Sequence, residues 1–381
     1  MIRKRDLVLI ENYFREYYFK NTDRIISSIK DFESREFAYI NFDGVMRRHI
    51  SLKEDEFKNW LMENVPRDFY HSVAYYLFPS KNMEAKSWEG ADLVFDIDLD
   101  HIRNYQTKTV AVCIDKGKIK ILEDEEKCDG DKREIMLLEE KGFEIAKREL
   151  LMLIEILARD FDIKEEDINI YFSGGRGYHV HVLKEEYQKL DSYARMEIKD
   201  YLTYDGIDIR NIKDVDARAF SSFANALLKL DDDLRKVFTE KEIEIMRRKL
   251  EEDKEKLLMF LRKNKALASK SNLFIIKYLG VQIDGVVTVD VSRLIRVPYS
   301  LHGKTGLVKK KINYEELDQF NPLSDAVRED EKKVRLKILY CPRIYWYDGE
   351  YGPYREEETV VPFSLAVYLV MRGLGHGIRE Y

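Results

Sequence analysis

The 381-residue sequence has little cysteine and little proline, with three residues of the first and seven of the second. The cysteines, Cys113, Cys128 and Cys341, are too few and too scattered for a disulfide framework, which is typical of a reducing compartment. A strong net charge is also lacking, because 65 basic side chains against 71 acidic ones leave a formal charge of −6. Global charge therefore indicates no nucleic-acid partner, and such a contact would have to come from local patches such as Lys309–Lys311.

Long hydrophobic runs are absent as well. The longest apolar stretch, Val360–Val370, is interrupted by Pro362 and is well short of the roughly 20 residues that cross a bilayer. Near the N-terminus, Glu11, Arg15 and Glu16 interrupt the apolar positions, so the core of a signal peptide is missing. We expect a soluble cytosolic protein that does not contact a membrane, in which the apolar run is buried within the same chain.

What is present suits a folded protein, since 45% of the residues are hydrophobic. Apolar spacing predicts helices over Leu7–Phe19, Leu61–Leu77 and Glu139–Phe161. Strands are predicted over Glu36–Phe42 and Arg47–Leu52 around an Asp43-Gly44 turn, and over Ile168–Phe172, Tyr178–Leu183 and Val286–Val291. The mixture predicts an α/β or α+β core.

One segment differs from the rest of the chain in composition. From about Glu185 to Lys270 the pattern is helical and highly charged, with Thr239 and Glu242 placed as a capping box. We interpret residues 185–270 as a helical insertion or sub-domain. Residues 1–184 and 271–381 then form one α/β or α+β domain that this segment interrupts.

The segment Leu93–Asp100 alternates strictly between large apolar and acidic residues, which predicts a strand. Asp96, Asp98 and Asp100 then share one face, with neighbours roughly 6.5–7 Å apart along the backbone. Two such carboxylates can converge on metal ions about 3.5–4 Å apart. The alternative is a solvated acidic face on an edge strand, so the rest of the sequence has to decide.

A second cluster, Ser173–Gly177, joins two predicted strands with three glycines, one hydroxyl and Arg176. Its backbone N–H groups can approach an anion closely while the guanidinium supplies charge, which suits a triphosphate. His179 and His181 share one face of the strand that follows. The alternative is an ordinary glycine-rich turn with a solvated arginine and structural histidines.

A third cluster runs from Asp284 to Gly306 and gathers two carboxylates, several cations and a histidine. It lacks the spacing of a P-loop, and alone it reads equally well as a strand followed by a surface loop. Taken together, the three clusters supply what metal-assisted nucleotidyl transfer needs: carboxylates for two divalent cations and basic groups for a triphosphate.

Three blocks, in this order and at these separations, resemble the catalytic small subunit of archaeal and eukaryotic DNA primase: Phe95–Asp98, Ser173–His181 and Arg293–Gly306. The resemblance implies a primase-polymerase fold with an RRM-like mixed sheet. It implies synthesis of short primers on single-stranded DNA from nucleoside triphosphates with Mg²⁺ or Mn²⁺, in a heterodimer with an iron–sulfur-containing large subunit. Such a protein is cytoplasmic in an archaeon and nuclear in a eukaryote.

The resemblance also implies roles for individual residues. Asp96 and Asp98 match the paired metal ligands, and Asp284 matches the third catalytic carboxylate, with Asp290 as the competing candidate. The positions that contact the phosphates of the incoming nucleotide are matched by Ser173, Arg176, His179, His302 and Lys304. No role is implied for Asp100 or His181, and Arg296 can contact nucleotide or template or pair with a carboxylate.

The sequence departs from the family pattern at one place. Many members carry a zinc knuckle soon after the paired aspartates, where this chain offers His101, Cys113 and Cys128. Because structural zinc normally takes four ligands, we expect no complete zinc site, and we expect Cys113 and Cys128 to be ordinary thiols. A zinc site that borrows His101 is the alternative.

Two other functions compete with a primase. A primase-related repair polymerase would extend a supplied primer but rarely start one. A non-catalytic nucleic-acid-binding subunit would need exposed aromatic residues on the sheet face where this chain carries aspartates. The sequence leaves the preference between ribo- and deoxynucleotides open, along with primer length and the surface that meets the large subunit.

Overall fold

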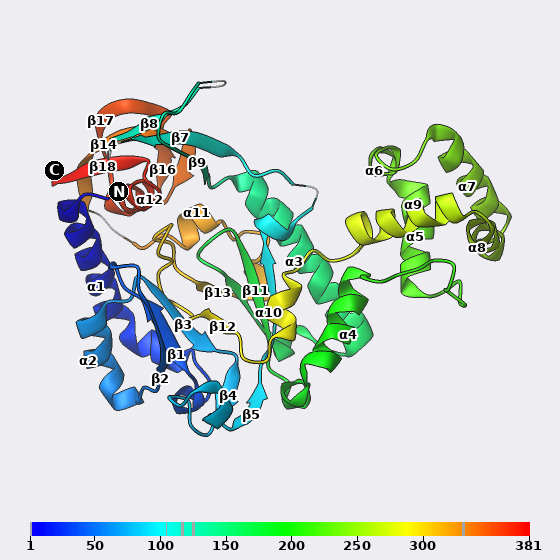
Figure 1. Cartoon of the computed structure of the whole chain (residues 1–381), viewed down its shortest axis with the longest axis horizontal. Helices are drawn as coiled ribbons and strands as arrows, with labels where there is room; N and C mark the ends of the chain where they lie inside the picture. Colours follow the sequence, from blue (N-terminus) through cyan, green and yellow to red (C-terminus); the bar gives the residue numbers. More distant parts are fainter. Residues whose placement is uncertain (1, 104, 116–117, 124–125, 330–331) are drawn as a thin grey trace.

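The computed structural model describes residues 2–103, 105–115, 118–123, 126–329 and 332–381. Helices and antiparallel sheets are mixed along the chain, which confirms the expected α+β class. Figure 1 shows a main body that contains the sheets and a lobe of helices, α5 to α9, that extends from one side.

The helices divide between these two parts. Those of the main body are α1 (Lys4–Ser27), α2 (Glu54–Asn64), α3 (Glu140–Phe161), α4 (Ser192–Thr203), α10 (Gly285–Val289), α11 (Pro322–Asp325) and α12 (Phe363–Met371). Those of the lobe are α5 (Arg218–Lys229), α6 (Asp231–Arg235), α7 (Glu240–Glu252), α8 (Lys254–Lys263) and α9 (Lys265–Phe274).

The first sheet carries the predicted N-terminal hairpin. Its order is β12 (Leu294–Arg296), β3 (Asp68–Ser72), β1 (Phe37–Ile40) and β2 (Met46–Ile50), and all of its pairs are antiparallel. Gly44 adopts φ +80° between β1 and β2, as the Asp43-Gly44 turn requires. Stacked rings of Phe37, Phe57 and Phe69 pack this sheet against α2.

The central sheet carries the paired aspartates. Its order is β13 (Lys310–Ile312), β10 (Ile168–Phe172), β11 (Gly177–Val182) and β6 (Leu93–Asp98), again antiparallel. Helix α3 contacts β6 and β11, and Phe95 and Ile97 belong to the buried core that includes this helix. Because strand side chains alternate, Asp96 and Asp98 lie on the opposite face.

The helical lobe has its own apolar cluster. Buried side chains between Tyr204 and Ile275, Phe223 and Phe274 among them, pack together apart from the main core. The predicted capping box is confirmed, since Thr239 and Glu242 each accept a hydrogen bond from the other's backbone N–H at the start of α7. The domain limits at 185 and 270 stay a prediction.

A C-terminal sheet and a three-stranded ribbon complete the main body. The sheet has the order β17 (Tyr354–Pro362), β14 (Lys333–Cys341) and β18 (Gly375–Glu380), and the ribbon β8 (Lys118–Ile121), β7 (Thr109–Asp115) and β9 (Asp131–Met136). The two-stranded hairpins are β4 (Ala74–Tyr76) with β5 (Trp88–Ala91) and β15 (Ile344–Trp346) with β16 (Gly349–Tyr351). Helix α12 is buried from Phe363 to Val370, which confirms that the apolar run is part of the core.

Two predicted elements are wrong. The predicted helix Leu61–Leu77 ends at Asn64, because Val65 takes a left-handed conformation and Pro66 cannot continue a helix; β3 and β4 follow. The predicted strand Val286–Val291 is instead the short helix α10. Its β-branched residues favour a strand, but the Asp284 side chain caps the helix and α10 packs against α4 and β6.

The expectation that Cys113 and Cys128 are separate thiols is also wrong. The antiparallel ribbon brings their Cα atoms to 5.5 Å, and the two form a disulfide. None of the described helices combines the length and apolar character that a bilayer span requires.

Candidate active site

Asp96 and Asp98 lie on β6, and His179 on β11 is directly opposite Asp96 in the register. His179 Nε2 is 3.4 Å from Asp96 Oδ1. Burial, together with the negative charges of Asp98 and Asp284, raises the pKa of Asp96 to about 7. Asp96 therefore ionises less readily than an exposed carboxyl, and positive charge brought to this face of the sheet would favour its ionised form.

Asp284 supplies a third carboxylate next to this pair. It is the N-cap of α10, and its backbone N–H donates to the backbone carbonyl of Asp96 at 2.8 Å. His101 Nε2 lies 3.6 Å from Asp284 Oδ2, so this histidine faces the carboxylates. The competing residue, Asp290, instead accepts hydrogen bonds from the backbone and hydroxyl of Ser292. This geometry favours Asp284 over Asp290.

The glycine-rich turn is held against β6. A Cβ at Gly177 would lie 1.7 Å from the carbonyl oxygen of Ile97, so a side chain has no room there. Ser173 Oγ accepts a hydrogen bond from the backbone N–H of Gly175 at 3.1 Å, which closes the turn on itself. The turn therefore presents its backbone beside the ends of the carboxylate pair.

The side chain of Arg176 extends from this turn to Asp98 and Asp100. Its Nη2 is 3.5 Å from Asp98 and 2.5 Å from Asp100, and its Nη1 contacts the sulfur of Met136. Asp100, to which the sequence assigned no role, therefore orients the guanidinium. Only 13% of the Arg176 side chain is exposed, which fixes it more firmly than a surface arginine.

The loop that carries His302 and Lys304 packs on the glycine-rich turn. The Thr305 hydroxyl donates to the Gly174 carbonyl at 2.5 Å, and the backbone N–H of Lys304 donates to His302 Nδ1 at 3.1 Å. A Cβ at Gly175 would lie 3.3 Å from His302 Nε2. Two segments that are distant in the sequence thus form adjoining walls of one site.

Asp68 anchors this second loop, and the sequence analysis missed it. Its Oδ1 accepts hydrogen bonds of 3.0 Å from the backbone N–H of Gly303 and from Arg296. Burial opposes ionisation of Asp68, but the charges of Arg296 and Arg67 lower its pKa to about 2. Of the roles left open for Arg296, the structure shows pairing with a carboxylate. No local pattern around Asp68 distinguished it from other strand-end aspartates.

Lys309 lies beneath the site and is fully buried, although the sequence analysis grouped it with a basic surface patch. Its Nζ donates to the Arg296 carbonyl at 2.8 Å and lies 3.4 Å from His181 Nε2. Burial lowers the pKa of Lys309, and burial next to the Lys309 charge lowers the pKa values of His179 and His181. His181 thus belongs to a buried supporting layer.

Five of the eight predicted site residues line one cavity of about 190 Å³: Asp96, Asp98, Ser173, His179 and His302. The other three do not line this cavity. Asp284 lines a neighbouring cavity of about 620 Å³, Lys304 lines one of about 720 Å³, and Arg176 is joined to Asp98 by its ion pair.

The carboxylates suit a hard divalent cation only in part. Among the described residues, no three His, Cys, Asp or Glu side chains are grouped closely enough to hold a metal ion by themselves. Mg²⁺, however, is commonly bound by one or two carboxylates together with phosphate oxygens of the substrate. The crowding that raises the pKa of Asp96 is what such a cation would relieve. The donor set therefore fits cations that arrive with a triphosphate.

The chain is similar to known primase subunits over nearly its whole length. Residues 95–314 match the family model described as DNA primase small subunit. Proteins named DNA primase small subunit from Archaeoglobus fulgidus, Picrophilus torridus and Nitrosopumilus maritimus are 36%, 33% and 31% identical to it, over 96%, 97% and 98% of this chain and 97%, 98% and 99% of theirs.

A solved structure with weak similarity is the polymerase domain of Mycobacterium tuberculosis Ligase D in complex with DNA. It is 10% identical, has a TM-score of 0.38, and is matched over 82% of this chain and 83% of that one.

Proposed function

The chain belongs to the DNA primase small subunit family, and we propose that it starts nucleic-acid chains on single-stranded DNA from nucleoside triphosphates. The observation that carries this proposal is the meeting of Asp96, Asp98 and Asp284 beside the Ser173–Gly177 turn and the His302–Lys304 loop. Carboxylates for cations and donors for phosphates thus adjoin one another. A nucleotidyl transfer needs both at once.

The proposed reaction joins two nucleotides. The 3′-hydroxyl oxygen of one attacks the α-phosphorus of the other, a new O–P bond forms, the bond to the β-phosphate oxygen breaks, and pyrophosphate leaves. The hydroxyl proton passes to water. No residue of the chain forms a covalent bond to the nucleotides. The site therefore acts by orienting the two nucleotides and by neutralising the charge of the phosphates.

In this reaction the aspartates bind the divalent cations. We propose Asp96, Asp98 and Asp284 as ligands of two Mg²⁺ or Mn²⁺ ions, which when bound make the hydroxyl easier to ionise and offset charge on the leaving pyrophosphate. Asp96 resists ionisation in their absence, so cation binding and proton release from this carboxyl are coupled.

The two loops hold the phosphates. Backbone N–H groups of the glycine turn, the Ser173 hydroxyl, Arg176 and Lys304 can all donate to phosphate oxygens. His179 and His302 have pKa values lowered by burial, so they act as neutral donors or acceptors. Arg176 pairs with Asp98 and Asp100 now. When a divalent cation binds Asp98 in place of Arg176, the guanidinium can donate hydrogen bonds to a phosphate.

The proposed function also requires two macromolecular partners. A subunit called small implies a larger one, and we propose a heterodimer with a primase large subunit, on a single-stranded DNA template. The choice between RNA and DNA primers is left to experiment, since no described contact separates a ribose from a deoxyribose.

The decisive experiment is primer-free synthesis on single-stranded DNA with nucleoside triphosphates and Mg²⁺ or Mn²⁺, with and without the large subunit. The parent chain is compared with Asp96→Ala/Asp98→Ala and with Asp216→Ala/Asp232→Ala. The latter pair removes two exposed carboxylates of the helical lobe as a matched control. We expect new oligonucleotides from the parent and the control, and at least a thousandfold less from the first variant, on the order of the loss seen when central electrostatic groups are removed.

Other outcomes assign the other functions. Synthesis that requires an added primer would indicate a repair-type polymerase. Template binding without synthesis in any assay would indicate a non-catalytic binding subunit. Near-parent activity of the Asp96→Ala/Asp98→Ala variant would remove these residues from the site.

A further inference from the structure

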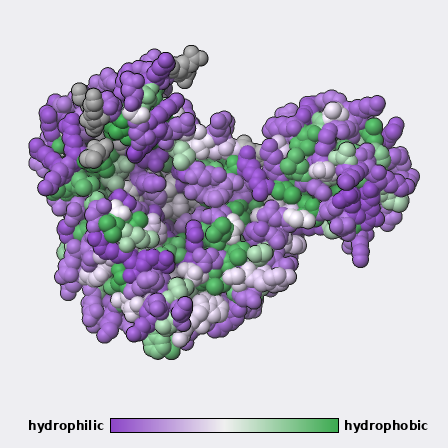
Figure 2. All heavy atoms as spheres, in the orientation of Figure 1, coloured by the Kyte–Doolittle hydropathy of each residue, from purple (hydrophilic) through white to green (hydrophobic). Residues whose placement is uncertain are grey.

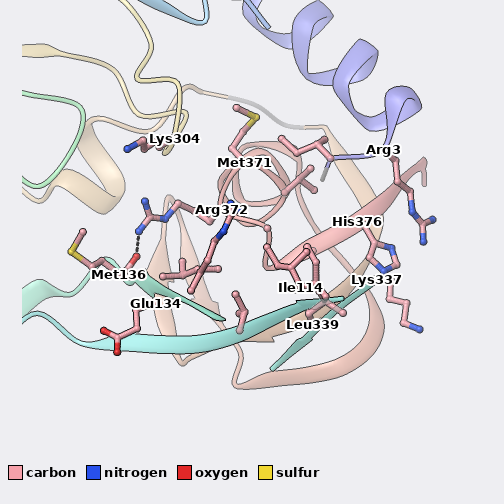
Figure 3. A pocket seen from close by; sticks show the side chains of 18 of the residues that line it. Arg3, Ile114, Glu134, Met136, Lys304, Lys337, Leu339, Met371, Arg372 and His376 are labelled. Carbon is pink, nitrogen blue, oxygen red and sulfur yellow. Dashed lines mark hydrogen bonds between the residues drawn. The ribbon is translucent and has the colours of Figure 1, made fainter. Parts of the chain in front are cut away.

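The cavity of about 720 Å³ lies between the β7–β9 ribbon and the C-terminal segment, beside the proposed phosphate site. Figure 3 shows that its two ends differ. Lys304 and Arg372 lie at one end, near Met136, and Arg3, Lys337 and His376 lie at the other. Between them the lining is mainly apolar.

Arg372 is the C-cap of α12, immediately after the last residue of this apolar helix. Its Nη2 donates to the backbone carbonyl of Met136, whose sulfur contacts Arg176. One residue therefore joins Arg372 to the arginine already assigned to the phosphates. Lys304 lines the same end of the cavity, so two cations from distant segments lie there, and Arg176 contacts Met136, which also lines this end.

Glu134 also lines this end of the cavity, near Met136. Arg176 has Asp98 and Asp100 as partners, but among the described residues no carboxylate forms an ion pair with Arg372 or Lys304. Arg372 Nε is buried without a hydrogen-bond partner in the described part of the chain. Burial lowers the pKa of Arg372, and so does the charge of Arg176, although Tyr368 and the charge of Asp100 oppose this shift. Unpaired, partly desolvated cations of this kind attract an anion strongly.

We propose that Arg372, together with Lys304, binds the terminal phosphate of the incoming nucleoside triphosphate and holds the pyrophosphate that is released. This assignment rests on the proposed triphosphate site and extends it by a residue from the C-terminal segment. The phosphate chain then runs from the α-phosphate at the aspartates to the γ-phosphate at the cationic end of the cavity. Arg372 is thus a binding residue that distinguishes nucleoside triphosphates from nucleotides with fewer phosphates.

A purely structural role for Arg372 makes a different prediction. If the side chain only ties α12 to β9 through Met136, its loss weakens the fold and reduces binding of every nucleotide alike. A terminal-phosphate ligand affects triphosphates selectively. The test therefore compares nucleotides that differ only in phosphate number.

The experiment measures equilibrium binding of GTP, GDP and GMP in Mg²⁺, and inhibition of synthesis by inorganic pyrophosphate. The variants are Arg372→Ala and Arg372→Gln, the second of which keeps a donor for the Met136 carbonyl. Arg3→Ala removes an arginine from the opposite end of the same cavity as a matched control. We expect both Arg372 variants to bind GTP roughly tenfold more weakly and to need roughly tenfold more pyrophosphate for inhibition, with GMP binding unchanged.

Unchanged GTP binding by Arg372→Gln, or equal losses for all three nucleotides, would overturn the assignment. If Arg372→Ala fails to fold, the Gln variant still decides. Lys304→Ala separates the two proposals: weaker GTP binding by Lys304→Ala but not by the Arg372 variants defeats only this inference. No effect of any of these substitutions on GTP binding defeats the proposed triphosphate site itself.

Discussion

The backbone N–H of Asp284 donates to the backbone carbonyl of Asp96 at 2.8 Å. This bond joins the N-cap of α10 to β6 of the central sheet, and it positions Asp284 through the main chain. This main-chain bond does not involve the side chains of Asp96 and Asp98, so Asp284 should keep its position when those two side chains are substituted. Substituting those side chains tests chemistry more than folding.

The pKa of Asp96 predicts an unusual pH dependence of stability. Its folded-state pKa of about 7 is above the value of 3.8 expected in the unfolded chain. The folded protein therefore keeps a proton that the unfolded chain releases, and the contribution of Asp96 to stability falls as pH rises from about 4 to about 7. We expect Asp96→Asn to remove this fall.

The measurement is thermal unfolding in a chelator across this pH range, for the parent and Asp96→Asn. The difference between the two curves isolates Asp96 from other titrating groups. A gap that stays constant with pH would contradict the raised pKa. Adding Mg²⁺ with a nucleoside triphosphate at pH 8 should raise the melting temperature of the parent more than that of the variant.

Lys304→Ala should weaken nucleotide use. Lys304 has no carboxylate partner among the described residues, so its charge is available to a phosphate. We expect the KM for nucleoside triphosphates to rise about tenfold with a smaller change in kcat. Steady-state synthesis at varied nucleotide concentration measures both. Lys337→Ala, at the far end of the same cavity, should leave KM unchanged; an equal effect would show that only net charge matters.

Gly177→Ala should damage the site through the backbone. The added Cβ would lie 1.7 Å from the Ile97 carbonyl oxygen, so β11 must separate from β6 at the level of Asp98. We expect a loss of about 2–3 kcal/mol in the free energy of unfolding. Urea denaturation measures this. Gly349→Ala, whose Cβ would meet nothing closer than 3.9 Å, is the matched control and should change stability by less than about 0.5 kcal/mol.

The Cys113–Cys128 disulfide should stabilise the β7–β9 ribbon. The two cysteines are 15 residues apart, and closing a loop of that size is worth about 3 kcal/mol at most. We expect a reducing agent to lower the melting temperature of the parent, and to have no effect on Cys113→Ser/Cys128→Ser.

Elemental analysis tests the expectation that the chain has no complete zinc site. About one zinc per chain would contradict it.

Figure 2 gives a further view of how the fold distributes its residues. Hydrophilic side chains cover most of the visible surface of both the main body and the lobe, with hydrophobic residues scattered among them. A largely hydrophilic surface is expected of a chain in which 36% of the residues are charged.

The sequence by itself predicted the features that local patterns encode. Strict alternation placed Asp96 and Asp98 on one face of a strand, glycine spacing marked the Ser173–Gly177 turn, and both follow from geometry within a few residues. The family resemblance rested on these same blocks. Burial of Val360–Val370 was likewise predictable, because that run has no polar face.

Only the tertiary structure decided the rest. Val286–Val291 has the residues of a strand, yet packing against α4 and β6 makes it a helix. Asp68 and Arg372 lie in ordinary local sequence, and their hydrogen-bond partners are far along the chain, Gly303 for one and Met136 for the other. Local patterns record which face of an element is apolar, whereas long-range pairing depends on how whole elements pack, and that information is spread over the entire core.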